Sequence, residues 1–315
     1  MKYTVAVRTL CEFTAKRGDL DLRFTPSATA LEGMAGHALV AASRGERYET
    51  EITLRGERGD LVVRGRADGF DPERGRLEEI KTYRGDLAAM PANRRALHWA
   101  QALVYGALLC AERGLAQLEV ALVYFDVATQ HETSLVETRT AQALRAFFED
   151  ACDRFLAWAA QESAHRAARD AGLAALAFPH AQFRAGQRQL AEQVWRAATA
   201  GRTLLAQAPT GIGKTVGTLF PQLKAMPGEK LDKLFFLAAK TPGRGLALHA
   251  LETIAAGPAV AGAPRRAPIR ILELVAREKA CEHPDKACHG ESCPLAQGFY
   301  DRLPAAREAA VAPTT

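Results

Sequence analysis

The sequence has no long apolar run, although apolar residues make up 48% of its 315 residues. No stretch reaches the roughly 20 apolar residues that a membrane-spanning helix needs. The opening residues, MKYTVAVRTLCEFTAKRGDL, contain no charged-then-apolar leader followed by a small-residue cleavage site. Internal repeats and low-complexity tracts are also missing. From these absences we expect no membrane-spanning helix and a cytoplasmic protein of about two globular domains.

Charge of one sign does not dominate the chain, whose net charge is +5 at pH 7. Residues 1–176 hold 23 Lys and Arg against 25 Asp and Glu, whereas residues 177–315 hold 18 against 11. The acidic-leaning first part suits metal-binding carboxylates, and the basic second part suits a surface that binds a polyanion. Many soluble domains are mildly basic, so the charge alone is weak evidence for a nucleic-acid partner.

The first part of the chain, residues 1–176, has the apolar periodicities of an α/β domain. Ser27 or Thr29 is available to cap a helix start, and Pro91 and Gly114 bracket another helix. Three short runs bounded by Gly or Asp predict a three-stranded meander. We expect strands over 2–10, 47–57, 60–70, 75–85, 118–127 and 131–140, and helices over 27–45, 91–114 and 141–172.

The second part, residues 177–315, begins near Pro179, which breaks the preceding helical pattern. Alternating β and α patterns follow, and such alternation indicates a parallel sheet. We expect strands over 202–208, 233–239 and 269–276, with helices over 184–201, 214–226 and 242–257. These strands are too few for a whole nucleotide-binding core.

A glycine-rich loop, APTGIGKT, joins the first of these strands to a helix. Its glycines let backbone N–H groups point inward at phosphate oxygens, and the helix N-terminus adds partial positive charge. With this spacing, Lys214 would bridge the β- and γ-phosphates and Thr215 would hold Mg²⁺. The sequence therefore predicts ATP and Mg²⁺ binding at Thr210, Gly211, Gly213, Lys214 and Thr215.

The loop resembles the AxTGxGKT form of motif I in superfamily 2 helicases. Upstream, FRAGQRQLAEQVWRA is similar to the segment whose glutamine reads adenine in that superfamily, which implies this role for Gln187. A solvated helix residue is the alternative for Gln187. Downstream, LFFLAAKTPGRGLALHAL looks like motif Ia, which implies that Lys240 and Thr241 contact the DNA backbone; an ordinary strand end is the alternative there.

Cysteines are few, and three of the six lie close together in REKACEHPDKACHGESCPLAQGFYDRL. Cys281, Cys288 and Cys293 are soft ligands that select zinc or an iron–sulfur cluster, and His283 or His289 could complete a zinc site. Disulfides are not expected in a reducing cytoplasm. Cys11, Cys110 and Cys152 lie in apolar surroundings and are predicted to be reduced core thiols.

The position of this loop, after the motif Ia segment, resembles the point where XPD/DinG-like helicases insert a four-cysteine [4Fe–4S] domain. The resemblance implies that Cys281, Cys288 and Cys293 are cluster ligands within about 275–315, and that the fourth cysteine lies beyond Thr315. It also implies that the Walker B acid lies beyond that residue. No DEAH-type acid or arginine finger is present, so the chain should bind nucleotide weakly and hydrolyse it hardly at all.

Carboxylates gather in the predicted meander. Glu79 and Lys81 alternate on one strand and therefore point to the same face, and Asp68 lies at the end of the preceding strand. Two carboxylates across a hairpin suit Mg²⁺ or Mn²⁺, and Lys81 could orient water or stabilise phosphate charge. His37 could add a ligand, although a lone helix histidine is more often structural. Gln101 and Tyr105 share one helix face. A solvated charged face is the alternative for the whole set.

The order of His37, Asp68 in RADG, Glu79 and Lys81 in EIK, and Gln101 and Tyr105 in QALVY resembles RecB-like PD-(D/E)xK nucleases, including the CRISPR-associated ones. The resemblance covers residues 1–176 and implies a restriction-endonuclease-type α/β fold. It implies metal ligation by His37, Asp68 and Glu79 and catalytic roles for Asp68, Glu79, Lys81, Gln101 and Tyr105. The Pro of the family signature is replaced by Ala67, and the four-cysteine cluster of some relatives is not evident. A degenerate, DNA-binding domain is the alternative.

Together the two resemblances imply an ATP-dependent DNA helicase of the XPD/DinG type in 177–315, fused to a metal-dependent single-strand nuclease in 1–176. The expected cofactors are ATP, Mg²⁺ or Mn²⁺ and a [4Fe–4S] cluster. The expected partner is single-stranded or forked DNA in repair or processing, bound mainly through its backbone. Two alternatives stay open: a non-catalytic nucleic-acid-binding regulator, and a P-loop ATPase with a zinc-binding loop.

Overall fold

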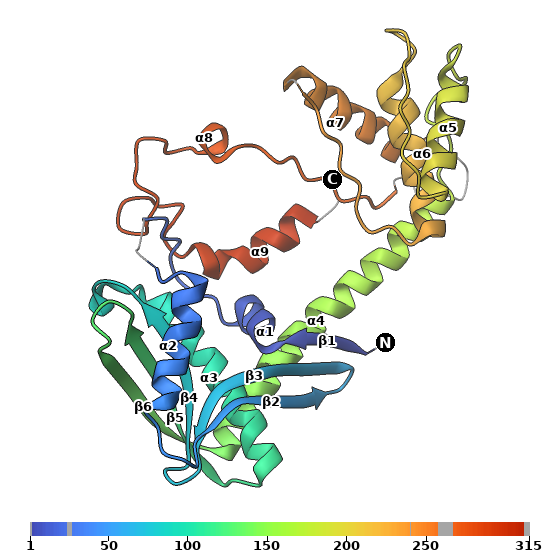
Figure 1. Cartoon of the computed structure of the whole chain (residues 1–315). Helices are drawn as coiled ribbons and strands as arrows, with labels where there is room; N and C mark the ends of the chain where they lie inside the picture. Colours follow the sequence, from blue (N-terminus) through green and yellow to red (C-terminus); the bar gives the residue numbers. More distant parts are fainter. Residues whose placement is uncertain (1, 24–26, 240, 258–266, 312–315) are drawn as a thin grey trace. The chain divides into compact units, whose positions relative to one another are not determined.

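A mixed sheet of six strands forms the centre of the first part of the chain (Figure 1). This computed structural model describes residues 2–23, 27–239, 241–257 and 267–311. The strand order is β1-β3-β4-β5-β6, with β2 also paired to β3. The strands are β1 Tyr3–Ala6, β2 Glu49–Arg58, β3 Leu61–Asp71, β4 Arg76–Tyr83, β5 Gln117–Asp126 and β6 Glu132–Thr140.

The pairing along β3 leaves a gap that matters for the site. One edge of β3 pairs with β2 along almost its whole length. The other edge pairs in parallel with β1 as far as Arg64, and antiparallel with β4 only from Gly69 onward. Strand β4 then runs parallel to β5 from Arg76 to Tyr83. Strands β3 and β4 therefore diverge just where Asp68 and Glu79 lie.

Helices cover both faces of this sheet (Figure 1). The larger core joins one sheet face to α1 (Val7–Thr14), α3 (Ala92–Arg113) and the first half of α4 (Ala141–Ala174). A small cluster on the other face joins Val40 of α2 (Ala30–Ala42) to Ile80 and Phe125. The predicted caps are present, because Thr29 forms a capping box with Glu32, and α3 lies between Pro91 and a left-handed Gly114.

The predicted strand over 2–10 is wrong in its second half. Only Tyr3–Ala6 is a strand, and α1 begins at Val7. Val7, Leu10, Cys11 and Thr14 are all buried, at the spacing of a helix face that packs on the sheet. Cys11, Cys110 and Cys152 are free thiols in the core, as predicted.

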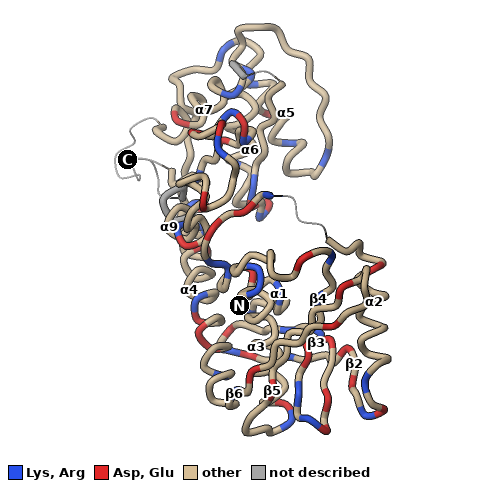
Figure 2. Tube along the Cα trace, turned by 90° about the vertical axis from the view of Figure 1, so that its left-hand side faces the viewer, with Lys and Arg blue, Asp and Glu red and all other residues tan. Residues whose placement is uncertain are grey.

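The chain divides into two compact units, Met1–Ala159 with Val275–Arg307, and Ala160–Leu274 with Glu308–Thr315. The second contains the end of α4, α5 (Gln187–Thr199), α6 (Lys214–Glu229) and α7 (Thr241–Ala256). The first unit also contains three short helical elements besides those already named, η1 (Leu87–Ala89), α8 (Arg277–Ala280) and most of α9 (Phe299–Val311). Acidic and basic residues are interleaved along β2, β3 and β4 (Figure 2).

The predicted strands over 202–208, 233–239 and 269–276 are not formed. Among the described residues of 160–274 there is no β-strand, so the parallel sheet expected there is absent. A strand needs a neighbour to satisfy its backbone and cover its apolar side chains. Leu205 and Leu237 are 95% and 90% exposed, which shows that these segments lack such cover. The helices predicted between them are present.

Membrane-spanning helices were not expected, and no helix among the described residues has the length and apolar character to cross a bilayer.

Candidate functional site

The divergence of β3 and β4 places Asp68 beside the backbone of β4. Its Oδ2 accepts a hydrogen bond of 2.7 Å from the Ile80 N–H, which no longer faces a β3 partner. Its Oδ1 lies 3.4 Å from Nδ1 of His37, a residue of α2, the helix on the sheet face opposite the larger core. The structure therefore brings together two residues that are 31 positions apart and that were both predicted as metal ligands.

Glu79 and Lys81 point to the same face of β4, as their alternation predicts. The Lys81 Nζ donates to Oε1 of Glu79 at 2.5 Å, and Glu79 is only 4% exposed. Burial raises the pKa of Glu79 to about 7; Lys81 opposes this rise and Asp68 adds to it. Asp68 is hydrogen-bonded to the N–H of Ile80, the residue that follows Glu79, so the two carboxylates lie at the same point of β4.

Helix α3 forms the wall of the site next to Glu79. Tyr105 is buried, its hydroxyl accepts a hydrogen bond from the Arg66 backbone, and burial raises its pKa, with Glu79 and Asp68 adding to the rise. Gln101 is buried one turn earlier on the same helix.

His98 and Tyr124 were not predicted and adjoin the same wall. His98 Nδ1 lies 3.0 Å from the Tyr124 hydroxyl, and Tyr124 pairs with Lys81 across β4 and β5. Burial, helped by the positive charge of the nearby Lys81, lowers the pKa of His98 to about 3, so the imidazole is neutral. The spacing of His98 from Gln101 and Tyr105, three and seven residues, was the sequence signal for its place on this face.

The donor set at this site is compatible with a divalent metal ion. Carboxylate oxygens and an imidazole nitrogen are ligands for Mg²⁺ and Mn²⁺. Removing a charged carboxylate such as Glu79 from water is unfavourable, and a bound cation would offset that cost. Within the described residues, however, no three His, Cys, Asp or Glu side chains are already arranged around one metal position. Ligation by Glu79 would need its side chain to exchange Lys81 for the metal.

The glycine-rich loop lies directly before α6, whose first residue is Lys214. Gly211 and Gly213 have φ of +87° and +78°, in the left-handed region that favours glycine. The Lys214 Nζ folds back to the carbonyl oxygens of Ala208 and Pro209, at 3.0 and 3.1 Å. Thr215 is half-buried and Thr210 exposed. The loop thus has the backbone turns and helix start that the motif predicts, without a β-strand before it.

Gln187 is 2% exposed, which excludes the solvated helix residue that was the alternative to adenine recognition. Its Oε1 accepts from the Arg184 N–H at 3.0 Å, and its Nε2 donates to the Gly213 carbonyl at 3.0 Å. A Cβ on Gly213 would lie 2.3 Å from that nitrogen. Both ends of the amide are therefore engaged, and its Nε2 end holds the loop backbone at Gly213; adenine recognition stays a prediction.

Replacing Gln187 distinguishes loop support from adenine recognition. We expect Gln187→Ala to weaken the affinities for ATP and GTP equally, by about tenfold, because the side-chain bond to the Gly213 carbonyl of the loop and the bond from the Arg184 N–H are both lost. Titration with fluorescent analogues of both nucleotides measures this, with the exposed Arg188→Ala on the same helix as control. A loss confined to ATP would instead support adenine recognition.

The predicted DNA-contact residues are not tested by the structure. Lys240 lies outside the described residues. Thr241 begins α7, and its side chain is also outside them.

The cysteine loop belongs to the first compact unit and packs along residues 18–22. The Leu20 N–H donates to the Ala296 carbonyl and the Leu22 N–H to the Cys288 carbonyl, at 2.8 and 2.9 Å. Cys293 is buried, whereas Cys281 and Cys288 are half-buried. In the part of the chain that the structure describes, these thiols form no group of three able to hold a metal. They do not fit a cluster as they lie, so we derive no chemistry from one.

Comparison with known proteins gives little further information. No family model matches the chain, and no curated protein matches it. Among solved structures, that of the protein designated SSO0001 matches over 48% of this chain and 76% of its own, with 20% identity and a TM-score of 0.31. A similarity this low carries no functional argument. The structure itself establishes a mixed α/β fold around the six-stranded sheet.

Proposed function

We propose that residues 1–176 act as a metal-dependent nuclease on single-stranded DNA. The observation that carries the proposal is the convergence of Asp68, Glu79 and Lys81 where β3 and β4 diverge, with His37 against Asp68. Two close carboxylates beside a lysine at a strand end can bind a hard cation and a phosphodiester together. The resemblance to RecB-like PD-(D/E)xK nucleases supports this proposal and adds Gln101 and Tyr105 as catalytic residues.

The residues divide the chemistry between them. His37, Asp68 and Glu79 would hold Mg²⁺ or Mn²⁺, which supplies charge neutralisation at the phosphate and lowers the pKa of a bound water. Lys81 orients the attacking water and stabilises negative charge on the phosphate oxygens. Water oxygen bonds to phosphorus, and the bond from phosphorus to the leaving sugar oxygen breaks. Tyr105 and Gln101 form the buried wall that supports the carboxylates.

We also propose that residues 177–315 belong to an ATP-binding segment of the XPD/DinG helicase type, in which the motor separates strands and the nuclease cuts the released one. The phosphate loop before α6 supports nucleotide binding, through Gly211, Gly213 and Lys214. The cysteine loop supports the iron–sulfur part of the proposal only by its sequence position.

Incubation of the chain with end-labelled single-stranded DNA and Mn²⁺ tests the nuclease proposal. Cleavage that depends on the metal supports it. If no single-stranded DNA is cut with either metal, the first part of the chain is a binding module instead.

Glu79 gives the metal-free protein a pH-dependent stability. The raised pKa means that the folded protein holds this proton more tightly than the unfolded chain does. The contribution of Glu79 to the free energy of unfolding is therefore complete below pH 4.5 and is lost as the pH rises to about 7. The loss is on the order of 3 kcal/mol. We expect Glu79→Gln to flatten this part of the profile, measured by urea unfolding in EDTA. An equal slope in variant and wild type would contradict the assignment.

A further inference from the structure

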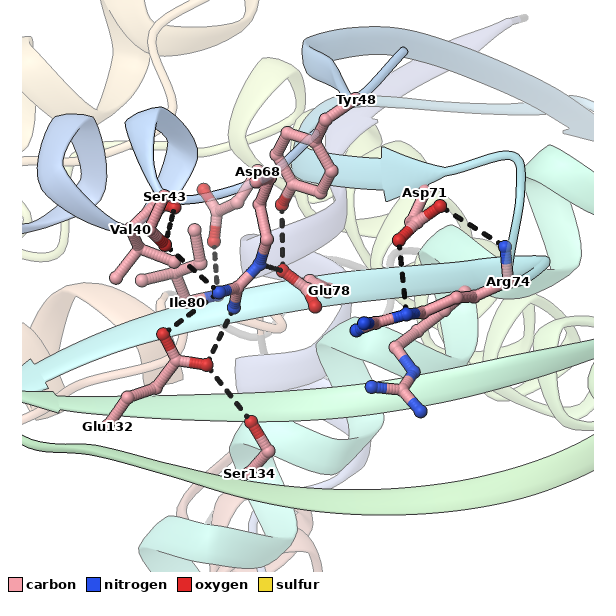
Figure 3. A network of polar contacts seen from close by, with 12 residues as sticks. Val40, Ser43, Tyr48, Asp68, Asp71, Arg74, Glu78, Ile80, Glu132 and Ser134 are labelled. Carbon is pink, nitrogen blue, oxygen red and sulfur yellow. Dashed lines mark hydrogen bonds and ion pairs between the residues drawn. The ribbon is translucent and has the colours of Figure 1, made fainter. Parts of the chain in front are cut away.

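A buried polar network joins the end of α2 to β4 and β6. The Arg44 guanidinium donates from Nε to Glu78 at 2.9 Å, and from Nη2 and Nη1 to Glu132 at 2.7 and 3.1 Å. The Tyr48 hydroxyl donates to the same Glu78 oxygen at 2.9 Å. Figure 3 shows Glu78 and Glu132 directed toward one guanidinium and the Tyr48 hydroxyl directed toward Glu78, with Asp68 and Ile80 beside them. The network was not predicted from the sequence.

This network contains or contacts the chain neighbours of both candidate metal-binding carboxylates, Asp68 and Glu79. Glu78 precedes Glu79 on β4 and points to the opposite face of the sheet. Tyr48 lies against Gly69, the residue after Asp68, where an added Cβ would lie 1.9 Å from the tyrosine hydroxyl. Arg44 is two residues beyond the end of α2, the helix that carries His37. A movement of the network would therefore reach His37, Asp68 and Glu79.

Apolar packing does little to hold α2 in place. Of the 13 residues of this helix only Gly36 and Val40 are buried, while Leu31, Met34 and Leu39 are exposed. Ion pairs hold the helix instead, Glu32 with Arg84 near its start and Arg44 with Glu78 and Glu132 past its end. The position of His37 thus depends on these polar contacts.

Buried ion pairs are a poor way to gain stability. Glu78 is 2% exposed and the Arg44 side chain 14%, so both charges have lost most of their hydration. Apolar or neutral replacements of a complete buried network are often as stable or more so, whereas removal of one partner leaves a costly unpaired charge. Such a network instead fixes the positions of the elements that it joins, because its hydrogen bonds have defined directions.

We infer that Arg44 is a positioning residue of the nuclease site, which fixes α2 so that His37 faces Asp68. The inference rests on the proposed nuclease function. Arg44 does not touch the scissile phosphate; it acts through His37 and through the backbone around Asp68 and Glu79.

A variant that neutralises the whole network, Arg44→Met with Glu78→Gln and Glu132→Gln, tests this role without leaving an unpaired charge. We expect its Tm to equal or exceed that of the wild type, its kcat for Mn²⁺-dependent cleavage to fall 10- to 100-fold, and its KM to change little. In a His37→Ala background the same three changes should lower kcat by a smaller factor than in the wild-type background, because the part of the effect that passes through His37 is already lost.

The matched control is Arg58→Met with Asp153→Asn, a paired surface guanidinium and carboxylate away from the site. Its kcat should equal that of the wild type. An unchanged kcat in the network variant overturns the inference but leaves the proposed nuclease function intact. A loss of activity together with a lower Tm indicates a purely structural role of the network, and it also overturns the inference.

Hydrogen exchange separates this inference from a failure of the proposed function. Amides in the last turns of α2 should exchange faster in the network variant at unchanged Tm, whether or not the wild type cleaves DNA. Unchanged protection of α2 overturns the inference. A wild type that cuts no DNA while α2 loosens in the variant refutes only the nuclease proposal.

Discussion

We expect Asp68→Ala and Lys81→Ala each to reduce Mn²⁺-dependent cleavage of single-stranded DNA by about a thousandfold or more. Asp68 is the carboxylate that contacts both His37 and β4, so its removal would deprive the proposed metal of a ligand. Lys81 is the cation beside Glu79, so its loss would remove the group that we propose orients the attacking water. Release of labelled fragments under single-turnover conditions measures both effects.

Both variants are expected to fold, because the Asp68 and Lys81 side chains are partly exposed and lie outside the hydrophobic core. The matched control is Glu137→Ala on β6, an exposed carboxylate paired with Arg139. It should cleave like the wild type. If all four proteins are equally inert with Mn²⁺ and Mg²⁺, the domain binds DNA without cutting it. If the Asp68 variant cleaves normally, the metal lies elsewhere.

The candidate site could be predicted from the sequence because its signals are local. Glu79 and Lys81 share a face by the alternation of a strand, and Gln101 and Tyr105 share one by the period of a helix. The gap in the β3 edge that admits Asp68 could not be predicted, because it depends on where β1 and β4 pair with β3. Tyr124 also escaped prediction, since only the β4–β5 register brings it to Lys81.

In the second part of the chain, by contrast, the strands predicted from the sequence are not formed. Its apolar runs, such as KLFFLAA at 233–239, have the composition of buried strands. Composition reports what a segment can do when partners are present, and a strand without a neighbour leaves its backbone and side chains exposed. Phe235 and Leu237 are exposed in the structure. The helices are present there, because α-helices satisfy their own backbone.

Lys214→Ala should reduce the affinity for ATP by about a hundredfold or more, because it removes the side-chain cation that the phosphate loop itself carries. In the structure this ammonium group is bonded to two carbonyl oxygens of its own loop, so it is already beside the cradle. Isothermal titration with Mg²⁺–ATP measures the change.

The fold of the Lys214 variant should be preserved, because the side chain is exposed and its removal creates no cavity. Lys233→Ala, an exposed lysine of the same unit outside the loop, is the control and should bind ATP like the wild type. The difference between the two variants separates a specific phosphate contact from a general loss of positive charge, which would weaken both equally. Unchanged affinity in the Lys214 variant would mean that the loop is a glycine-rich turn without a nucleotide.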